Sequence, residues 1–217
     1  DGLPDLVVNS ILGKVVWYRN IGTRKAPKLA GAQPVEVEWP KPQPALKWGW
    51  MRPEGKGLLT QWRTTPVVVD WNKDGLNDLI MLDHEGYLTH LPRARRDGRV
   101  VLDAPQRIFE TQKPGYVRLN TRTAGGSGRR KLCVVDWDGD GALDVLANSP
   151  NAELWKNVGS REGMTRLILQ GTLFERNISS HTTSPTVVDW NGDKVPDLLV
   201  GAEDGFLYYG RNKRSEK

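Results

Sequence analysis

The sequence predicts an all-β protein, and three observations support this. Valine-rich apolar runs recur along the 217-residue chain, no segment shows convincing helical periodicity, and 23 glycines and 14 prolines interrupt the runs. Short apolar runs separated by such residues are typical of β-strands joined by turns. No apolar run approaches the roughly 18 residues that a membrane-spanning helix requires. The pattern therefore argues against a helical bundle and against a membrane span.

Four copies of one sequence unit organise the chain. A strand, an acidic loop and a second strand follow one another at 64–82, 131–147 and 183–201, and residues 1–8 match the second half of this unit. The aspartates in register are Asp1, Asp74, Asp140 and Asp193, which suits a four-stranded blade better than a solenoid coil. We expect third strands at 13–22, 151–159 and 205–212, and fourth strands at 34–39, 106–110 and 171–176.

These units predict a β-propeller of four-stranded antiparallel blades, with about three and a half to four blades present. We expect one partial propeller domain over 1–217, with repeat units at 1–39, 64–110, 131–176 and 183–212. A closed ring needs more chain, so the remainder of a larger propeller is an expected partner. The connection 40–63 contains four prolines and three tryptophans. It is either a linker or a folded insertion, and the tryptophans favour an insertion.

The acidic loops carry the strongest chemical signal, the pattern D-x-[DN]-x-D-G-x-x-D. Oxygens at alternate positions of a tight loop converge on one point, and calcium takes six to eight oxygen ligands at ~2.3–2.6 Å. Asp and Asn also build ordinary turns, but a turn needs only one or two of them. The predicted ligands are Asp70, Asn72, Asp74, Leu76 and Asp78; Asp136, Asp138, Asp140, Ala142 and Asp144; and Asp189, Asn191, Asp193, Val195 and Asp197, where Leu76, Ala142 and Val195 would contribute backbone carbonyls.

The sequence therefore predicts two to three calcium sites. The third loop departs from the pattern, because Lys194 stands at the sixth position, where glycine with a positive φ is usual. Asp1 and Asp5 form only half of a loop, so we expect no firm binding there.

The combined motif V-V-D-W-x-G-D-G-x-x-D followed by W-[RK]-N-x-G resembles the FG-GAP, or VCBS, repeats of integrin-like propellers. The resemblance covers nearly the whole chain. It implies about seven or eight blades in a complete protein, calcium between the first and second strands, and an extracellular, cell-surface or periplasmic location. It does not fix an activity, because the family includes adhesion modules, lectin-like proteins and some polysaccharide lyases.

The charge balance favours an acidic partner. The chain carries a formal net charge of +5, although many of its 26 acidic residues lie in the three loops. A basic surface on an extracellular protein suits a polyanionic glycan, and a merely solvated surface is the alternative. No alternation of aromatic and basic residues points to nucleic acid. Arg93, Arg95 and Arg96 are interpreted as a solvated face, and His90 as structural.

The strand directions place a second set of polar residues at the end of each blade opposite the calcium loops. They are Arg63, Thr64, Asp83, His84, Glu85, Arg129, Arg130, Asn148, His181, Thr182, Glu203 and Asp204. Within this set His84, His181, Arg63 and Arg129 are weak catalytic candidates, because Arg and His beside carboxylates could bind a uronate and abstract a proton next to its carboxylate. Loops at blade edges are also polar without any function.

Two functions follow from this reading. The first is a calcium-stabilised extracellular module that binds acidic carbohydrate or a protein partner through the face opposite the calcium loops. The alternative is a lyase of uronate-containing polysaccharide, similar to rhamnogalacturonan or rhamnose-glucuronate lyases. We also expect Trp71, Trp137 and Trp190 to pack between adjacent blades. Loss of a buried large aromatic such as Trp137 should cost ~3–5 kcal/mol.

Overall fold

The computed structural model describes residues 1–44, 46, 52–121, 129–180 and 182–216, and within them the protein is all-β. The only helical element described is a short 3-10 helix, η1 (Lys213–Glu216), so no described helix has the length and hydropathy of a membrane span. The chain divides into two compact units. The first unit is Asp1–Arg107 with Arg118–Gly128, and the second is Ile108–Val117 with Arg129–Lys217.

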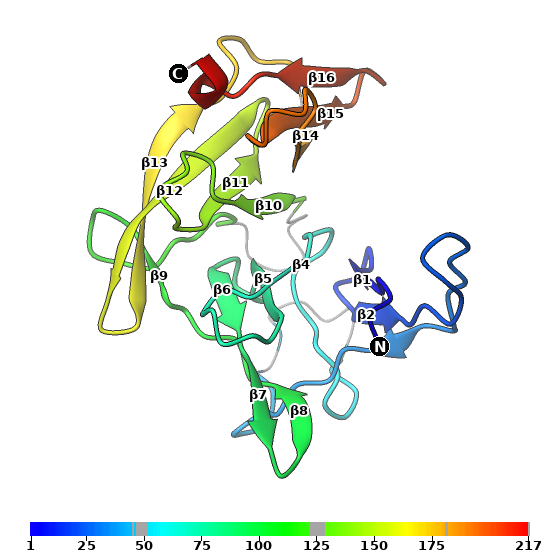
Figure 1. Ribbon diagram of the computed structural model, residues 1–217. Helices are drawn as coiled ribbons and strands as arrows, with labels where there is room; N and C mark the ends of the chain where they lie inside the picture. The colour runs from blue at the N-terminus through cyan, green and yellow to red at the C-terminus, as the bar shows by residue number, and fades with distance from the viewer. Residues whose placement is uncertain (45, 47–51, 122–128, 181, 217) are drawn as a thin grey trace. The chain divides into compact units, whose positions relative to one another are not determined.

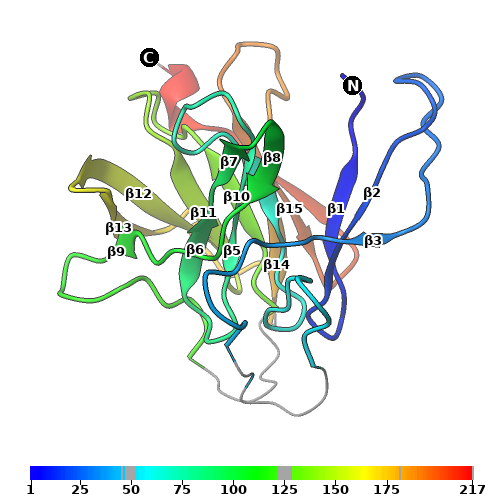
Figure 2. The same cartoon turned by 90° about the horizontal axis from the view of Figure 1, so that it is seen from below.

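The first unit contains two three-stranded antiparallel sheets and one hairpin (Figures 1 and 2). One sheet has the order β1-β2-β3, and the other has the order β4-β5-β6. The hairpin pairs β7 with β8. The strands are β1 (Leu6–Asn9), β2 (Val15–Tyr18), β3 (Gln33–Pro34), β4 (Val67–Val69), β5 (Asp78–Leu82), β6 (Leu88–Leu91), β7 (Arg93–Arg96) and β8 (Arg99–Leu102).

The second unit contains the largest sheet, with the order β10-β11-β12-β13-β9, and a three-stranded antiparallel sheet, β14-β15-β16. The strands β12 and β13 form a long hairpin that extends beyond β11 (Figure 1). The bounds are β9 (Phe109–Glu110), β10 (Leu132–Val135), β11 (Asp144–Asn148), β12 (Ala152–Arg161), β13 (Met164–Thr172), β14 (Thr183–Val188), β15 (Asp197–Ala202) and β16 (Leu207–Gly210).

Each unit has its own apolar core, built from alternate residues of its strands. In the first unit, Val15 of β2 and Met81 of β5 are buried in one cluster with Leu58, which lies in the 40–63 connection. The N–H of Val15 donates to the Leu58 carbonyl at 3.1 Å, so this part of the connection runs beside the sheet. In the second unit, Leu146 of β11 and Val200 of β15 belong to one cluster that joins the two sheets.

The predicted first and second strands are present, but the fourth strands differ from the prediction. Segment 34–39 forms only the end of β3, at Pro34, and isolated bridges at Glu36 and Glu38. Segment 106–110 makes a single bridge from Gln106 to His90 and then contributes β9, which pairs in parallel with β13 of the second unit. The fourth antiparallel strand of the largest sheet is β13, upstream of the predicted 171–176. Four antiparallel strands therefore occur in one described sheet.

The prediction for the tryptophans is correct at one position and wrong at another. Trp137 is half-buried and packs in the cluster that joins the two sheets of the second unit. Trp190, at the equivalent position of β14–β15, is 61% exposed, and its ring centre lies 6.1 Å from that of Tyr209 on β16. Trp48 and Trp50 of the 40–63 connection lie outside the described residues.

Candidate functional site

The three acidic loops lie between equivalent strands, after β4, β10 and β14, and they fold in the same way. In each loop the first aspartate accepts a hydrogen bond from the N–H of the sixth residue. The distances from Oδ2 of Asp70, Asp136 and Asp189 to these nitrogens are 3.0, 3.1 and 3.0 Å. The aspartate at the fifth loop position (Asp74, Asp140 or Asp193) accepts a hydrogen bond from the N–H of the residue at the seventh position. The distances to the nitrogens of Leu76, Ala142 and Val195 are 2.8–2.9 Å. The three loops therefore share one backbone geometry, which directs their side-chain oxygens inward.

The backbone of this loop requires a positive φ at two positions. The sixth position has φ values of 84° at Gly75, 87° at Gly141 and 68° at Lys194. The structure thus confirms that Lys194 occupies a left-handed position where glycine is usual. The fourth position is also left-handed, with φ 60° at Lys73, and the sequence analysis did not identify this requirement.

The aspartate at the ninth position of each loop is buried and accepts a backbone N–H from a residue in the third strand of its sheet or just after it, a contact that we call the brace. Asp144 is fully buried and accepts the N–H of Asn157 at 2.8 Å on Oδ1 and the N–H of Trp137 at 3.0 Å on Oδ2. Asp197 accepts the N–H of Asn212 in the same way, at 2.9 Å. Burial, partly opposed by the bonds from Asn157 and Trp137, raises the pKa of Asp144. These carboxylates are structural whatever else they bind.

The same brace recurs in the first unit. Asp78 accepts the N–H of Arg93 at 2.8 Å, and its other oxygen lies 2.7 Å from Nε2 of buried His90, which accords with the structural role expected of this histidine. Asp5 accepts the N–H of Asn20 at 2.7 Å. The sequence analysis missed this brace. Its signal was the asparagine of the W-[RK]-N-x-G motif, which recurs at a nearly constant distance from the last aspartate of the loop.

The central loop gathers carboxylates most closely. One carboxylate oxygen from each of Asp136, Asp138 and Asp144 lies within 4.8 Å of the other two, an arrangement that could hold a metal ion. Among the described residues no other group of three acidic, histidine or cysteine side chains meets this criterion. Three carboxylates at this spacing fit a hard divalent cation, because such cations prefer oxygen ligands. The donor set therefore fits calcium.

Two cationic side chains lie against this loop. The Lys156 ammonium contacts a carboxylate oxygen of Asp138 and lies 3.5 Å from Oδ2 of Asp140. The hydrogen bond from Lys156 lowers the pKa of Asp138. Arg214 of η1 lies over Gly139, within the distance at which a Cβ at Gly139 would clash. The loops after β4 and β14 have asparagine at the third position, and Nδ2 of Asn72 and of Asn191 donates to the fifth aspartate at 2.9 and 2.8 Å.

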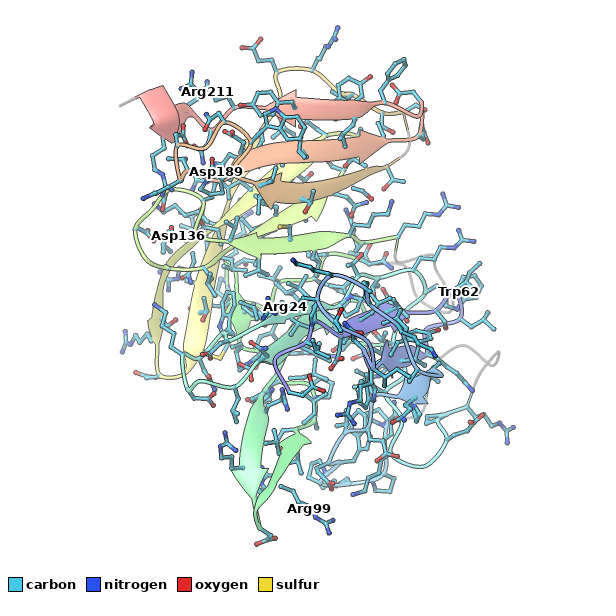
Figure 3. All side chains as sticks on the ribbon, turned by 45° about the vertical axis from the view of Figure 1, so that its right-hand side comes forward. Arg24, Trp62, Arg99, Asp136, Asp189 and Arg211 are labelled. Carbon is cyan, nitrogen blue, oxygen red and sulfur yellow. The ribbon has the colours of Figure 1, made fainter. Side chains whose placement is uncertain are left out.

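Figure 3 shows Asp136 and Asp189 at the same end of their two neighbouring sheets, with Arg211 at that end too. The last predicted ligand of each loop, Asp78, Asp144 or Asp197, is the first residue of the following strand. The ligand roles of all the predicted residues, including the carbonyl roles of Leu76, Ala142 and Val195, stay predictions. The loop of Asp1 and Asp5 shows its half of the same pattern, since Oδ1 of Asp1 accepts the N–H of Leu3 at 3.0 Å.

At the end of β5 opposite the acidic loop, the carboxylates of Asp83 and Glu85 are paired with Arg107. Nε of Arg107 donates to Oδ2 of Asp83 at 2.7 Å, and Nη2 donates to Oε2 of Glu85 at 2.6 Å. The guanidinium lies 3.9 Å from the ring centre of Tyr87. Burial alone would lower the pKa of Arg107, but the hydrogen bonds to Glu85 and Asp83 raise it. Asp83 and Glu85 therefore form an ion-pair cluster around the turn after β5.

The other predicted candidates are divided between the two units. Arg63 is exposed, has φ 52° and belongs to the first unit with half-buried His84. Arg129 belongs to the second unit, where its carbonyl accepts Nδ2 of Asn148 at 2.7 Å. His181 lies outside the described residues.

The neighbours of Arg129 in the second unit also use their polar groups internally. Nη1 of Arg130 donates to the Asn148 carbonyl at 2.8 Å, and burial lowers the pKa of Arg130. Asn148 also contacts the hydroxyl of Thr182. Oε1 of Glu203 accepts the hydroxyl of Ser180 at 2.5 Å, and the pKa of Asp204 is lowered by a hydrogen bond from Tyr208. Much of this end is thus occupied by internal hydrogen bonds.

Comparison with known proteins identifies one part of the chain. A search against curated proteins found no match. A family model described as an FG-GAP-like repeat matches residues 136–200, from the first aspartate of the central loop into β15. The match includes both acidic loops of the second unit and the brace between them. Residues 136–200 of this all-β chain are therefore similar to an FG-GAP-like repeat.

Proposed function

We propose that this protein is a calcium-stabilised module of the β-propeller type. The observation that carries the proposal is the threefold recurrence of one loop geometry, together with the close carboxylates of Asp136, Asp138 and Asp144. Oxygen donors at this spacing suit calcium, with its six to eight ligands, better than soft or small metals. FG-GAP-like repeats are often calcium-binding, which supports the same assignment.

Calcium has a structural role in this proposal. When bound, it neutralises the clustered carboxylates and ties the end of the first strand to the start of the second. The ninth aspartate already fixes the third strand through backbone hydrogen bonds, as Asp144 does with Asn157. The loop thus connects three strands of one sheet. A filled cage of protein oxygens leaves no position for a substrate.

Thermal unfolding in calcium and in chelator tests this proposal. We expect EDTA to lower the melting temperature and added CaCl₂ to restore it, since a ligand that binds only the folded state stabilises it by about 2.7 kcal/mol at one hundred times its Kd. MgCl₂ should restore less, because magnesium demands a small octahedral site. The double variant Asp136→Asn/Asp138→Asn should lose the part of the response that comes from the central loop and keep the part that comes from the loop after β14.

The matched control is Glu110→Gln/Glu162→Gln, which removes two carboxylates of the same unit outside the loops. It should keep the full response to calcium. Identical melting curves in EDTA and in CaCl₂, with the protein folded in both, would refute structural calcium.

The proposal includes a partner at the ends of the sheets opposite the loops. The basic charge balance of the chain supports an acidic glycan, and a protein is the other partner class. Polygalacturonate is a suitable probe. We expect the double variant Arg63→Gln/Arg129→Gln, which replaces one exposed and one half-buried arginine, to bind it more weakly and with a flatter dependence on salt, because fewer screened charges then attract the glycan. Unchanged binding by the folded variant would remove the glycan from the proposal and leave a protein partner.

The lyase alternative has less support, because Asp83 and Glu85 are paired with Arg107 and are not free to act as bases. An ultraviolet assay for unsaturated uronate ends, with polygalacturonate as substrate, separates the two functions. The binding module predicts no increase in absorbance, and a sustained increase lost in His84→Ala would favour the lyase. An extracellular, cell-surface or periplasmic location belongs to the proposal and rests on the FG-GAP-like repeat.

A further inference from the structure

The hairpin of β7 and β8 in the first unit contains Arg93, Arg95 and Arg96, for which the sequence predicts a solvated face. It projects from the end of β6, and Arg99 lies at its far end, away from the rest of its unit (Figures 1 and 3). Its two strands are four residues each, or about 13 Å long. It leaves the sheet at the calcium-loop end of β5, because the N–H of Arg93 donates to Asp78.

The base of this hairpin is firmly attached. The N–H of Arg93 donates to Oδ1 of Asp78 at 2.8 Å, and the N–H of Asp103 donates to the carbonyl of Pro92 at 2.8 Å. The carbonyl of Leu102 accepts the N–H of Glu38 at 2.8 Å, so a third segment pairs with β8 at its base. Leu102 also packs against the core of the unit. The hairpin is therefore held by backbone bonds on both strands.

The tip is a tight two-residue turn. Asp97 and Gly98 have φ values of 48° and 73°, as a type I′ turn requires at both central positions. Such a turn matches the twist of the two strands and fixes their register. The side chains beside the turn therefore have little freedom to move apart, and a ligand that binds them meets a nearly rigid surface.

Arginines surround this turn. Arg95, Arg96 and Arg99 are exposed, and Arg96 is paired directly across the two strands with Arg99. Like charges in directly opposed positions destabilise a hairpin. Nη2 of Arg96 donates to Oδ2 of Asp103 at 2.7 Å, which offsets part of this repulsion. Among the described residues, neither Arg95 nor Arg99 has a carboxylate within ion-pair distance.

The residue types at the tip decide what kind of anion fits. Guanidinium groups bind planar or tetrahedral oxyanions with two parallel hydrogen bonds. The strands contain no aromatic residue on which a nucleobase could stack, and no bulky aromatic that could enter a bilayer. Three arginines also supply fewer contacts than the six to ten phosphates that a duplex-binding protein neutralises. A thin chain that carries repeated anions matches the tip best.

We propose that the tip of the β7–β8 hairpin, through Arg95, Arg96 and Arg99, is a contact site for an acidic polysaccharide. Anions of the polysaccharide relieve the repulsion between the opposed arginines, which Asp103 offsets in part by accepting a hydrogen bond from Arg96. This site lies at the calcium-loop end of its sheet. It is separate from the opposite end proposed above, and its three arginines lie outside the acidic loops.

Dextran sulfate and dextran test this proposal, because they share one backbone and differ in their anions. We expect wild-type protein to bind dextran sulfate in a calorimetric titration and to ignore dextran. The variant Arg95→Gln/Arg99→Gln should bind dextran sulfate roughly tenfold more weakly, with a flatter salt dependence. The variant Arg95→Lys/Arg99→Lys keeps the positive charges but loses the paired N–H donors of the guanidinium groups. Its affinity for dextran sulfate should therefore lie between that of wild type and that of Arg95→Gln/Arg99→Gln.

Two control variants complete the design. Lys25→Gln/Arg52→Gln removes two exposed charges of the same unit elsewhere, and should change the affinity less than twofold. Arg63→Gln/Arg129→Gln removes the charges of the opposite end, so its result reports on that proposal and not on the hairpin. Melting temperatures within the error of wild type establish that each variant is folded.

Three results would overturn the hairpin proposal. The first is equal affinity for dextran sulfate in wild type and Arg95→Gln/Arg99→Gln. The second is no binding of dextran sulfate by wild type. The third is tighter binding of a DNA duplex, or of phosphatidylserine vesicles, that depends on the same two arginines, which would assign the hairpin to another class of partner.

Discussion

The β10–β13 sheet and the β14–β16 sheet of the second unit contain the same loop and the same brace, but differ in what covers them. Trp137 of the first is half-buried and packs against the apolar cluster that includes Leu146 of its own sheet and Val200 of the second. Its carbonyl accepts Nδ2 of Asn212 at 3.0 Å. Trp190, its counterpart, is 61% exposed. Within this unit, the loop and brace are properties of one sheet, whereas burial of the tryptophan depends on the neighbouring sheet, as in other repeat proteins.

Removing the brace aspartate, Asp144 or Asp197, should lower the free energy of unfolding more than the other substitutions do. The loss should be similar in both sheets. Replacing Asp144 or Asp197 with Ala removes two acceptors from buried or partly buried donors, and each unsatisfied buried donor costs about 1–3 kcal/mol. We expect each substitution to lower the free energy of unfolding by about 3 kcal/mol, measured by urea denaturation in EDTA. In the same buffer, Asp138→Ala should cost less than about 1 kcal/mol, because its partner Lys156 is a surface cation.

A small effect of Asp197→Ala beside a large effect of Asp144→Ala would contradict a shared brace. It would mean that the covering of the β10–β13 sheet, and not its own hydrogen bonds, makes Asp144 important.

The tryptophans should separate the two sheets most clearly. Trp137→Ala removes a large ring from the cluster between the sheets, and we expect a loss of about 3 kcal/mol in the free energy of unfolding. Trp190→Ala should change it by no more than about 0.5 kcal/mol, as for other exposed positions. Denaturation curves of both variants in calcium provide the measurement. Equal losses would show that another surface covers Trp190 in solution.

The sixth loop position should show a smaller effect with opposite signs in the two sheets. Gly141 and Lys194 both have a left-handed backbone, which costs a non-glycine residue roughly 1–2 kcal/mol. We expect Gly141→Lys to destabilise the protein by about 1 kcal/mol and Lys194→Gly to stabilise it by somewhat less, because glycine also loses more entropy on folding. Urea denaturation in EDTA would detect both changes. Destabilisation by Lys194→Gly would show that the lysine side chain makes a stabilising contact.

The sequence predicted what repeats and missed what occurs once or depends on a partner segment. The acidic loops, their strands and the left-handed Lys194 follow from a pattern present three times. The β7–β8 hairpin was missed because it occurs in one repeat, although Asp97 and Gly98 are a strong turn signal. The sequence also did not predict that β9 pairs with β13, because tertiary contacts and not the residues of β9 set this pairing.

The candidate site shows the same limit. Spacing placed the predicted ligands in their loops, but it could not reveal that Asp144 is fully buried and braces Asn157. The spacing also could not reveal that Arg107 forms ion pairs with Asp83 and Glu85. These residues are brought together by the turn after β5 and by the bridge between His90 of β6 and Gln106.

Thiol reactivity offers a comparison of the two first strands that needs no change in stability. Cys133 on β10 and Thr186 on β14 each lie three residues before the first aspartate of their loops. Burial, partly opposed by backbone hydrogen bonds from Val187 and Val134, raises the pKa of Cys133 to about 11. Thr186 is exposed, so a cysteine at that position should have an ordinary pKa of about 8.5.

In the variant Thr186→Cys, the new thiol should therefore react with iodoacetamide at pH 8 about a hundredfold faster than Cys133, because only the thiolate reacts. Mass spectrometry of peptides after timed labelling separates the two sites, and labelling in urea should make their rates equal. The folded pKa of Cys133 lies above its unfolded value, so the buried thiol contributes stability below pH 9 that is lost as pH rises toward 11. Equal labelling of both cysteines in the folded protein would show that β14 does not cover β10 in solution, and would remove the basis for treating the two sheets differently.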